Sequence, residues 1–97
     1  MKVYEVLVLP QAQDEANAIR RYQNAESLER GRRFMAAWLA CLENLRTDPL
    51  YQKRKGSFRH VNLHKLPYRV VFGVSDTKVM VYQVRHTSRK AHSKFGP

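Results

Sequence analysis

The sequence has one cysteine, Cys41, and no apolar run that approaches the roughly 20 residues needed by a membrane-spanning helix. A single cysteine forms no internal disulfide, which is typical of a reducing compartment, so we expect a cytoplasmic protein. The first residues, MKVYEVLVLPQAQ, lack a small-residue cleavage site, so no signal peptide is predicted. With 97 residues the chain can build one hydrophobic core, and we expect a single domain over residues 1–97.

Acidic residues are almost absent from the second half of the chain, where Asp76 is the only one. Residues 1–52 carry seven lysines and arginines and seven acids, whereas residues 53–97 carry eleven lysines and arginines. The formal net charge of +10 therefore belongs to the second half alone. Such one-sided charge repels itself, and an interspersed pattern would be equally soluble. The distribution predicts a negatively charged partner, either nucleic acid or an acidic protein.

Motifs for several kinds of catalysis are missing as well. The chain has no Ser-His-Asp order, no glycine-rich phosphate loop and no cysteine pair, and its eight acids are scattered. Carboxylate-based and two-metal chemistry therefore have little support. His60 and His64 would lie about 13 Å apart along a strand, too far to share one zinc ion. No metal site and no cofactor are predicted, and whether the protein is an enzyme stays open.

Hydrophobic periodicity predicts one strand followed by two helices. Residues 2–9 (KVYEVLVL) are β-branched and aliphatic and predict the strand. The first helix is predicted from Gln11, and Asn24 is the predicted N-cap of the second, which ends before Asp48-Pro49. The helices should form an αα-hairpin, and Gly31 on its inner face favours a close crossing. The predicted inward-facing residues are Ala12, Ala16, Ile19 and Tyr22 in the first helix and Leu28, Gly31, Phe34, Met35, Trp38, Leu39, Cys41, Leu42 and Leu45 in the second.

Three strand patterns follow the helices, at residues 57–64, 68–74 and 79–84. The last two are separated by the polar turn Ser75-Asp76-Thr77-Lys78, which predicts a β-hairpin. The order β-αα-βββ predicts an α+β fold in which a helical hairpin packs on one face of a mainly antiparallel four-stranded sheet.

Arg69 is the most informative polar residue, because it interrupts an otherwise apolar central strand. An ionised side chain there is costly unless it is paired or faces a groove. Two interpretations remain open: a structural arginine that bonds a helix end or an acid such as Asp48, and a functional one. Arg85, His86 and Arg89 follow the last predicted strand and could fold over the same sheet face. Such a cluster would suit a phosphate backbone or a phosphorane-like transition state.

Further basic, polar and aromatic residues could contact a nucleic acid or another target on this face. His60, Asn62 and His64 share one face of their predicted strand, at the spacing of two residues. The candidate contact residues are Lys53, Lys55, Arg59, Asn62, His64, Arg85, Lys90, Lys94 and Phe95.

Four segments covering almost the whole chain carry a family resemblance: LPQAQDEANAI, RGRRFMAAWLACLENLRTDP, FRHVNLHKLPYRVVFGV and VMVYQVRHTSR. Together they resemble the RelE/ParE superfamily of bacterial toxins from type II toxin–antitoxin modules. The combination of LPYRVVF with VYQVRHTSR is the most specific part. The fold that the resemblance implies has the order β-αα-βββ, which agrees with the order predicted from periodicity.

The resemblance implies two alternative activities. RelE-like members enter the ribosomal A site and cut mRNA by in-line attack of a ribose 2′-OH, whereas ParE-like members poison DNA gyrase. Placed on the RelE pattern, Arg69 takes the position of the transition-state arginine, Arg89 that of a late arginine, and Phe95 that of a catalytic tyrosine. Phe95 cannot move a proton, so an imidazole such as His60 or His86 would have to do so. The candidate catalytic residues are therefore Arg69, Arg89, His60 and His86.

Two further features of the sequence favour one of these two activities. The long helical hairpin and the HTSR segment favour ParE-like members. Both activities imply an acidic antitoxin, encoded beside the toxin gene, whose partly disordered segment folds on the basic face in a hetero-oligomer. A non-toxic nucleic-acid-binding module is a third alternative, which accounts for the charge but not for the similarity along the full chain.

Overall fold

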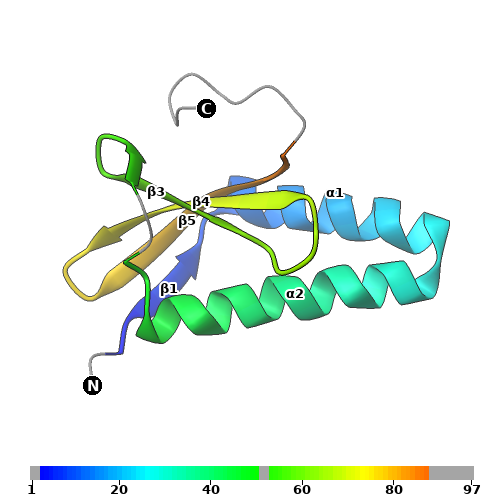
Figure 1. Cartoon of the computed structure of the whole chain (residues 1–97), viewed down its shortest axis with the longest axis horizontal. Helices are drawn as coiled ribbons and strands as arrows, with labels where there is room; N and C mark the ends of the chain where they lie inside the picture. Colours follow the sequence, from blue (N-terminus) through cyan, green and yellow to red (C-terminus); the bar gives the residue numbers. More distant parts are fainter. Residues whose placement is uncertain (1–2, 51–52, 88–97) are drawn as a thin grey trace.

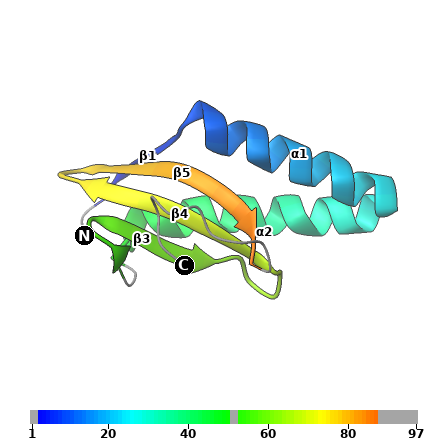
Figure 2. The same ribbon diagram turned by 90° about the horizontal axis from the view of Figure 1, so that it is seen from above.

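Two helices and five strands make up the computed structural model, which describes residues 3–50 and 53–87 (Figure 1). The strands are β1 (Glu5–Val8), β2 (Lys53–Lys55), β3 (Phe58–Asn62), β4 (Tyr68–Ser75) and β5 (Lys78–His86), and the helices are α1 (Pro10–Glu26) and α2 (Leu28–Thr47). The helices lie side by side against the sheet, and the tip of their hairpin projects beyond the ends of the strands (Figures 1 and 2). The predicted α+β class and element order are confirmed.

The sheet has the strand order β1-β5-β4-β3-β2. β5 lies between the parallel β1 and the antiparallel β4, so the first and last strands of the chain are neighbours. The short β2 adds an edge strand to the four predicted from the sequence. No helix in residues 3–50 or 53–87 is long and apolar enough to cross a membrane.

The two helices meet at Ser27, three residues later than predicted. The Ser27 hydroxyl accepts a hydrogen bond from the backbone N–H of Arg30 (3.1 Å) and caps α2, whereas Asn24 stays inside α1. Asparagine and serine are both good N-caps, so local propensity does not decide between them. The close crossing predicted at Gly31 is confirmed, because a Cβ at this position would overlap the Asn24 side chain.

The core lies between the helices and one face of the sheet, and its position shifts the buried stripe of α2. Phe34 and Cys41, which widen the predicted stripe, are buried, whereas Leu28 and Leu39 are exposed. Tyr22 of α1 was also predicted to face inward and is exposed. The buried stripe of α2 therefore belongs to one core shared with α1 and the sheet, and it excludes Leu28 and Leu39. The buried residues of α2 are Gly31, Phe34, Trp38, Cys41 and Leu45.

A β-bulge in β5 decides which of its side chains face the helices. The register of β4 and β5 shifts between Val71 and Phe72, which leaves Tyr82 as an extra residue in β5. Side chains alternate between the two faces of a strand, so one extra residue reverses the alternation beyond it. The core valines of β5 are accordingly Val79 and Val81 before the bulge and Val84 after it.

The predicted β4–β5 hairpin is confirmed. β4 ends at Ser75 and β5 begins at Lys78, so the turn consists of Asp76 and Thr77. Asp76 has φ of 55°, in the left-handed region that aspartate adopts more readily than most residues.

Candidate functional site

Arg69 and Arg85 lie directly opposite each other on neighbouring strands. In the register of the sheet, Asn62 of β3 pairs with Arg69 of β4, and Arg69 pairs with Arg85 of β5. Directly opposed residues share a face, with Cβ atoms about 4.5–5.5 Å apart. This face points away from the helices, because Val70 and Val84, the neighbours of the two arginines, belong to the core. We call Asn62, Arg69 and Arg85 the basic row.

The two arginines of the basic row have no acidic partner in the described part of the chain. The ion pairs there include Arg30–Glu26 and Arg46–Glu43, and neither involves Arg69 or Arg85. The structural interpretation of Arg69, a bond to Asp48 or to a helix end, thus has no counterpart among the contacts of residues 3–50 and 53–87. Like charges placed directly opposite destabilise a sheet, so this pair costs stability and attracts anions.

His60 shares the face of the basic row but is buried. It pairs with Val71, two residues along β3 from Asn62, and its exposed fraction is 8%. A general acid or base must reach the proton that it transfers. Burial therefore separates this imidazole from a substrate that contacts Arg69.

His86 lies on the face opposite to Arg69. It pairs with Tyr68, and the two rings pack edge to face with centroids 5.4 Å apart. Tyr68 is a buried core residue that also packs against Phe34 (5.3 Å). Because β5 extends to His86, Arg85 and His86 belong to the strand instead of following it as predicted. Arg85 therefore lies beside Arg69 on one face of the sheet, and His86 lies on the face that the helices cover.

The remaining predicted contact residues are dispersed. His64 lies in the turn after β3, beyond the strand face on which it was predicted. Arg59 pairs with Phe72, a core residue, and therefore points to the helix-covered face. Lys53 and Lys55 belong to the edge strand β2. Arg89, Lys90, Lys94 and Phe95 lie outside the described residues.

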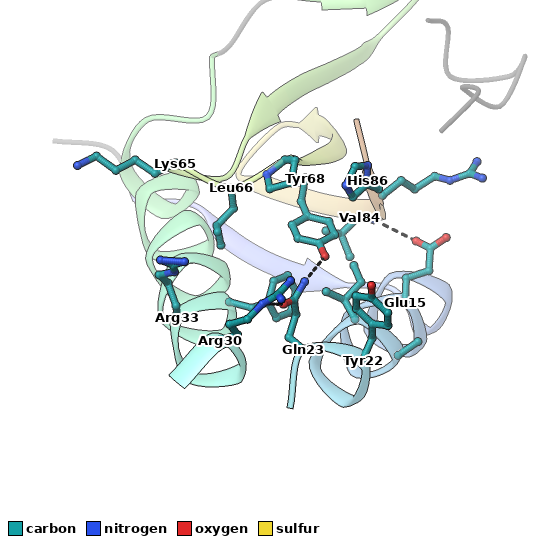
Figure 3. A pocket seen from close by; sticks show the side chains of 15 residues that line it. Glu15, Tyr22, Gln23, Arg30, Arg33, Lys65, Leu66, Tyr68, Val84 and His86 are labelled. Atoms are coloured by element: carbon teal, nitrogen blue, oxygen red, sulfur yellow. Dashed lines mark hydrogen bonds between the residues drawn. The ribbon is translucent and has the colours of Figure 1, made fainter. Parts of the chain in front are cut away.

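A pocket of about 770 Å³ opens on the helix-covered face of the sheet, where β4 begins and β5 ends. It lies between the tip of the helical hairpin and the β3–β4 loop (Figure 3). Both helices and the sheet contribute apolar lining residues, which include Ile19, Phe34, Leu66 and Val84. The arginines and lysine of the lining are Arg30, Arg33, Lys65 and Arg85, against the single acid Glu15 among the described residues. We call this space the tip pocket.

Gln23 joins the walls of the tip pocket by hydrogen bonds (Figure 3). Its Nε2 donates to the Tyr68 hydroxyl oxygen (2.7 Å), and its Oε1 accepts from Arg30 Nε (2.9 Å). Gln23 and Tyr68 are buried, and an unsatisfied polar group at such a place would cost about 1–3 kcal/mol. The two bonds hold the Arg30 side chain beside the pocket.

Glu15 covers the edge of β5 at the tip pocket. β1 pairs with β5 only as far as Val81, and farther along the strand the Val84 N–H donates to Glu15 Oε1 (3.0 Å). An uncovered strand edge tends to pair with other chains, so this bond protects the fold. The Glu15 carboxylate keeps its single negative charge, which is fewer than the four positive charges of Arg30, Arg33, Lys65 and Arg85, so the cations of the pocket remain in excess.

The tip pocket was not predicted from the sequence. Gln23, Arg30 and Arg33 lie in the half of the chain whose net charge is zero, so composition gave no reason to select them. Tyr22 was assigned to the core, yet it is 60% exposed and lines the pocket. The available signal was Gly31, because a glycine at a helix crossing brings the flanking residues of both helices together.

Comparisons with known proteins agree with this fold. The family model described as "ParE toxin of type II toxin-antitoxin system, parDE" matches residues 6–91. A solved structure titled "Chromosomal ParDE TA system from P. aeruginosa" contains a chain that matches with a TM-score of 0.76 and 12% identity. That match covers 89% of this chain and 98% of the other, and at such low identity it shows a shared fold. No curated protein sequence matches significantly.

Proposed function

Because the chain belongs to the ParE family of toxins from type II toxin–antitoxin systems, we propose that it arrests growth by poisoning DNA gyrase. The family match also confirms the membership of the RelE/ParE superfamily that the sequence segments indicated. In this proposal the basic row contacts the complex of gyrase with DNA, and an acidic antitoxin suppresses the activity.

The basic row is the observation that carries the proposal. Arg69 and Arg85 stand side by side on the face away from the helices, although their mutual repulsion lowers stability. A pair of arginines without acidic partners in the described chain suits contact with a negatively charged surface. Guanidinium groups bind phosphates and carboxylates in a bidentate manner, and gyrase bound to DNA presents both.

The positions of the imidazoles favour a gyrase poison over a ribosome-dependent nuclease. Cleavage of RNA needs a proton carrier next to the cation that stabilises the phosphate. Among the described residues, His60 is buried and His86 faces the helices. A gyrase poison needs a cationic contact surface but no proton transfer.

The partner in this proposal is an acidic antitoxin encoded beside the gene. The solved structural relative is described as a ParDE toxin–antitoxin system. The formal charge of +10 in residues 53–97 would be offset by an acidic segment that folds on the toxin. The toxin would act once this segment is removed.

The experiment that tests the target uses the purified full chain, gyrase, ATP and supercoiled plasmid. Gyrase trapped on broken DNA releases linear plasmid when the complex is denatured, so the linear fraction should rise with the amount of chain. A parallel reaction with translating ribosomes should leave the mRNA intact.

Two other outcomes would contradict the proposal. Cleaved mRNA together with unchanged plasmid would assign the chain to the RelE-like activity. Normal growth on expression without antitoxin, together with nucleic-acid binding that falls steeply with salt, would indicate a simple binding module.

A further inference from the structure

We propose that the tip pocket binds an apolar side chain flanked by carboxylates from the antitoxin, and that Arg85 makes this binding incompatible with target contact. The inference rests on the proposed function, because it takes the antitoxin as the occupant. The inference adds the binding site of the antitoxin, which is the tip pocket, and the residue through which the antitoxin blocks the basic row, which is Arg85.

The size and lining of the tip pocket suit a protein segment better than a single ion. Its volume of about 770 Å³ can hold several side chains. Ile19 of α1 and Leu66 of the β3–β4 loop provide partly exposed apolar surface, and the buried Phe34 of α2 lies beneath it. Tyr22 is exposed in the absence of a partner, and exposed aromatic residues are common anchors of protein interfaces. An occupant should therefore insert an aliphatic or aromatic side chain.

The charge of the lining selects an acidic segment. Arg33 and Lys65 are exposed and form no ion pair within the described chain. Glu15 is the single acid of the lining among the described residues, so its one negative charge leaves the cations of the pocket in excess. Positive residues around an apolar surface attract carboxylates and repel basic segments, which sets the choice of partner. A second copy of this chain, with its net charge of +10, is a poor candidate.

The pocket is organised before any partner arrives. The hydrogen bonds from Gln23 to Tyr68 and from Arg30 to Gln23 connect α1, α2 and β4 across it (Figure 3). Arg30 is thereby held in one orientation, with Glu26 approaching it at 3.7 Å. Binding to a preformed site loses less conformational entropy than binding to a mobile one.

Arg85 belongs to both sites. It lines the tip pocket together with Val84 and His86, and it pairs with Arg69 in the basic row. β1 ends its pairing with β5 at Val81, so Arg85 stands at the edge of the sheet, where the two faces meet. A carboxylate in the pocket that pairs with Arg85 would remove one of the two charges of the row. An antitoxin bound in the tip pocket would in this way weaken target binding by the basic row on the opposite face of the sheet.

A matched pair of charge reversals tests the pocket. Arg33→Glu changes a pocket residue, and Arg32→Glu makes the same change at the next position of α2, which is exposed and outside the pocket. The probe is the small acidic protein encoded beside this gene, titrated into each full-length variant by calorimetry. Arg33→Glu should weaken binding by about tenfold or more, and Arg32→Glu by less than about threefold. Equal losses, or no binding to the parent chain, would overturn the inference.

A second pair separates the pocket from the basic row. Arg85→Gln should reduce both the affinity for the same acidic protein and the growth arrest by the free toxin. Arg69→Gln should abolish growth arrest and leave that affinity within about threefold. If Arg69→Gln weakens the complex as much as Arg33→Glu does, the row itself is the antitoxin site and the inference is wrong. If Arg85→Gln leaves the affinity unchanged, the coupling through Arg85 is wrong.

Different results would contradict the proposed function and the binding of the antitoxin in the tip pocket. Absence of growth arrest by the parent chain contradicts the proposed function, whereas the affinities of the Arg33→Glu and Arg32→Glu variants still decide the pocket. A cooperative thermal unfolding transition in every variant shows that each is folded.

Discussion

The two faces of the sheet at the ends of β4 and β5 differ in how their polar groups are satisfied. On the helix-covered face, the buried Gln23 donates a hydrogen bond to Tyr68 and accepts one from Arg30, so both polar atoms of its amide have partners. On the other face, Arg69 and Arg85 stand together without an ion pair in the described chain. Tyr68 and Arg69 are consecutive residues of one strand. Tyr68 packs in the core and bonds Gln23 at the tip pocket, whereas Arg69 lies on the other face, where we propose that it contacts the target.

This difference depends on one extra residue in β5. With strict alternation from Val79 and Val81, Arg85 would point into the core, where an unpaired guanidinium is costly. The bulge at Tyr82 reverses the alternation, so that Val84 enters the core and Arg85 joins Arg69. β-bulges are frequent next to functional sites because they redirect a side chain in this way.

The largest expected effect is on the stability of the helix-covered face. Phe34→Ala removes a buried ring that packs on Tyr68 and should lower the free energy of unfolding by about 3–5 kcal/mol. Leu28→Ala, at an exposed position of the same helix, should change it by less than about 0.5 kcal/mol. Urea denaturation of both variants checks this difference, and similar losses would show that α2 packs along another stripe.

The thiol of Cys41 provides a pH test of the same face. Burial raises the pKa of this thiol from 9.0 to about 11. The unfolded chain ionises first as the pH rises, so the stabilising contribution of the neutral thiol is present below pH 9 and is lost toward pH 11. The shift corresponds to up to about 2–3 kcal/mol. Relative to Cys41→Ala, the parent chain should lose stability over this range, and parallel pH profiles would contradict the burial.

Tyr68→Phe should have a smaller effect, and on stability alone. The variant removes the acceptor of the Gln23 Nε2 hydrogen bond and leaves a buried amide unsatisfied, at a cost of about 1–3 kcal/mol. Tyr22→Phe, at an exposed ring, is the matched control. Denaturation should separate the two variants, while both arrest growth like the parent chain. Loss of growth arrest in a folded Tyr68→Phe variant would assign this face a direct role in target contact.

The smallest expected change in the free energy of unfolding is an increase, in contrast to the losses expected for the variants above. Arg69→Gln relieves the repulsion with Arg85 and should raise the free energy of unfolding by about 0.2–1 kcal/mol at low salt. The gain should shrink at high ionic strength, because salt screens exposed charges. A loss of stability in Arg69→Gln would instead mean that Arg69 bonds a structural partner.

The sequence predicted the parts of the fold that local patterns encode. Periodicity identified the order of helices and strands and the β4–β5 turn, and the burial cost of a charge singled out Arg69. The helix junction was misplaced because Asn24 and Ser27 are equal as caps, and tertiary contacts decide between them. Asn24 stays helical where Gly31 lets α2 approach it closely.

Two features could not be predicted because they arise from pairing across the chain. Alternation within residues 79–84 gives no sign of the bulge at Tyr82, which exists only in the register with β4. Arg85 and His86 were therefore expected on one face and lie on two. The tip pocket likewise needs Gln23 to meet Tyr68, 45 residues away, and no local pattern links them.

The most direct test of the role of the basic row is a titration of gyrase and supercoiled plasmid with three chains: the parent, Arg69→Gln and Lys78→Gln. Lys78 is an exposed cation at the far end of β5, so its loss changes the net charge equally. Linear plasmid should accumulate with the parent chain and with Lys78→Gln at similar concentrations, and Arg69→Gln should produce none. Equal accumulation with Arg69→Gln would contradict the assignment of target contact to the paired arginines.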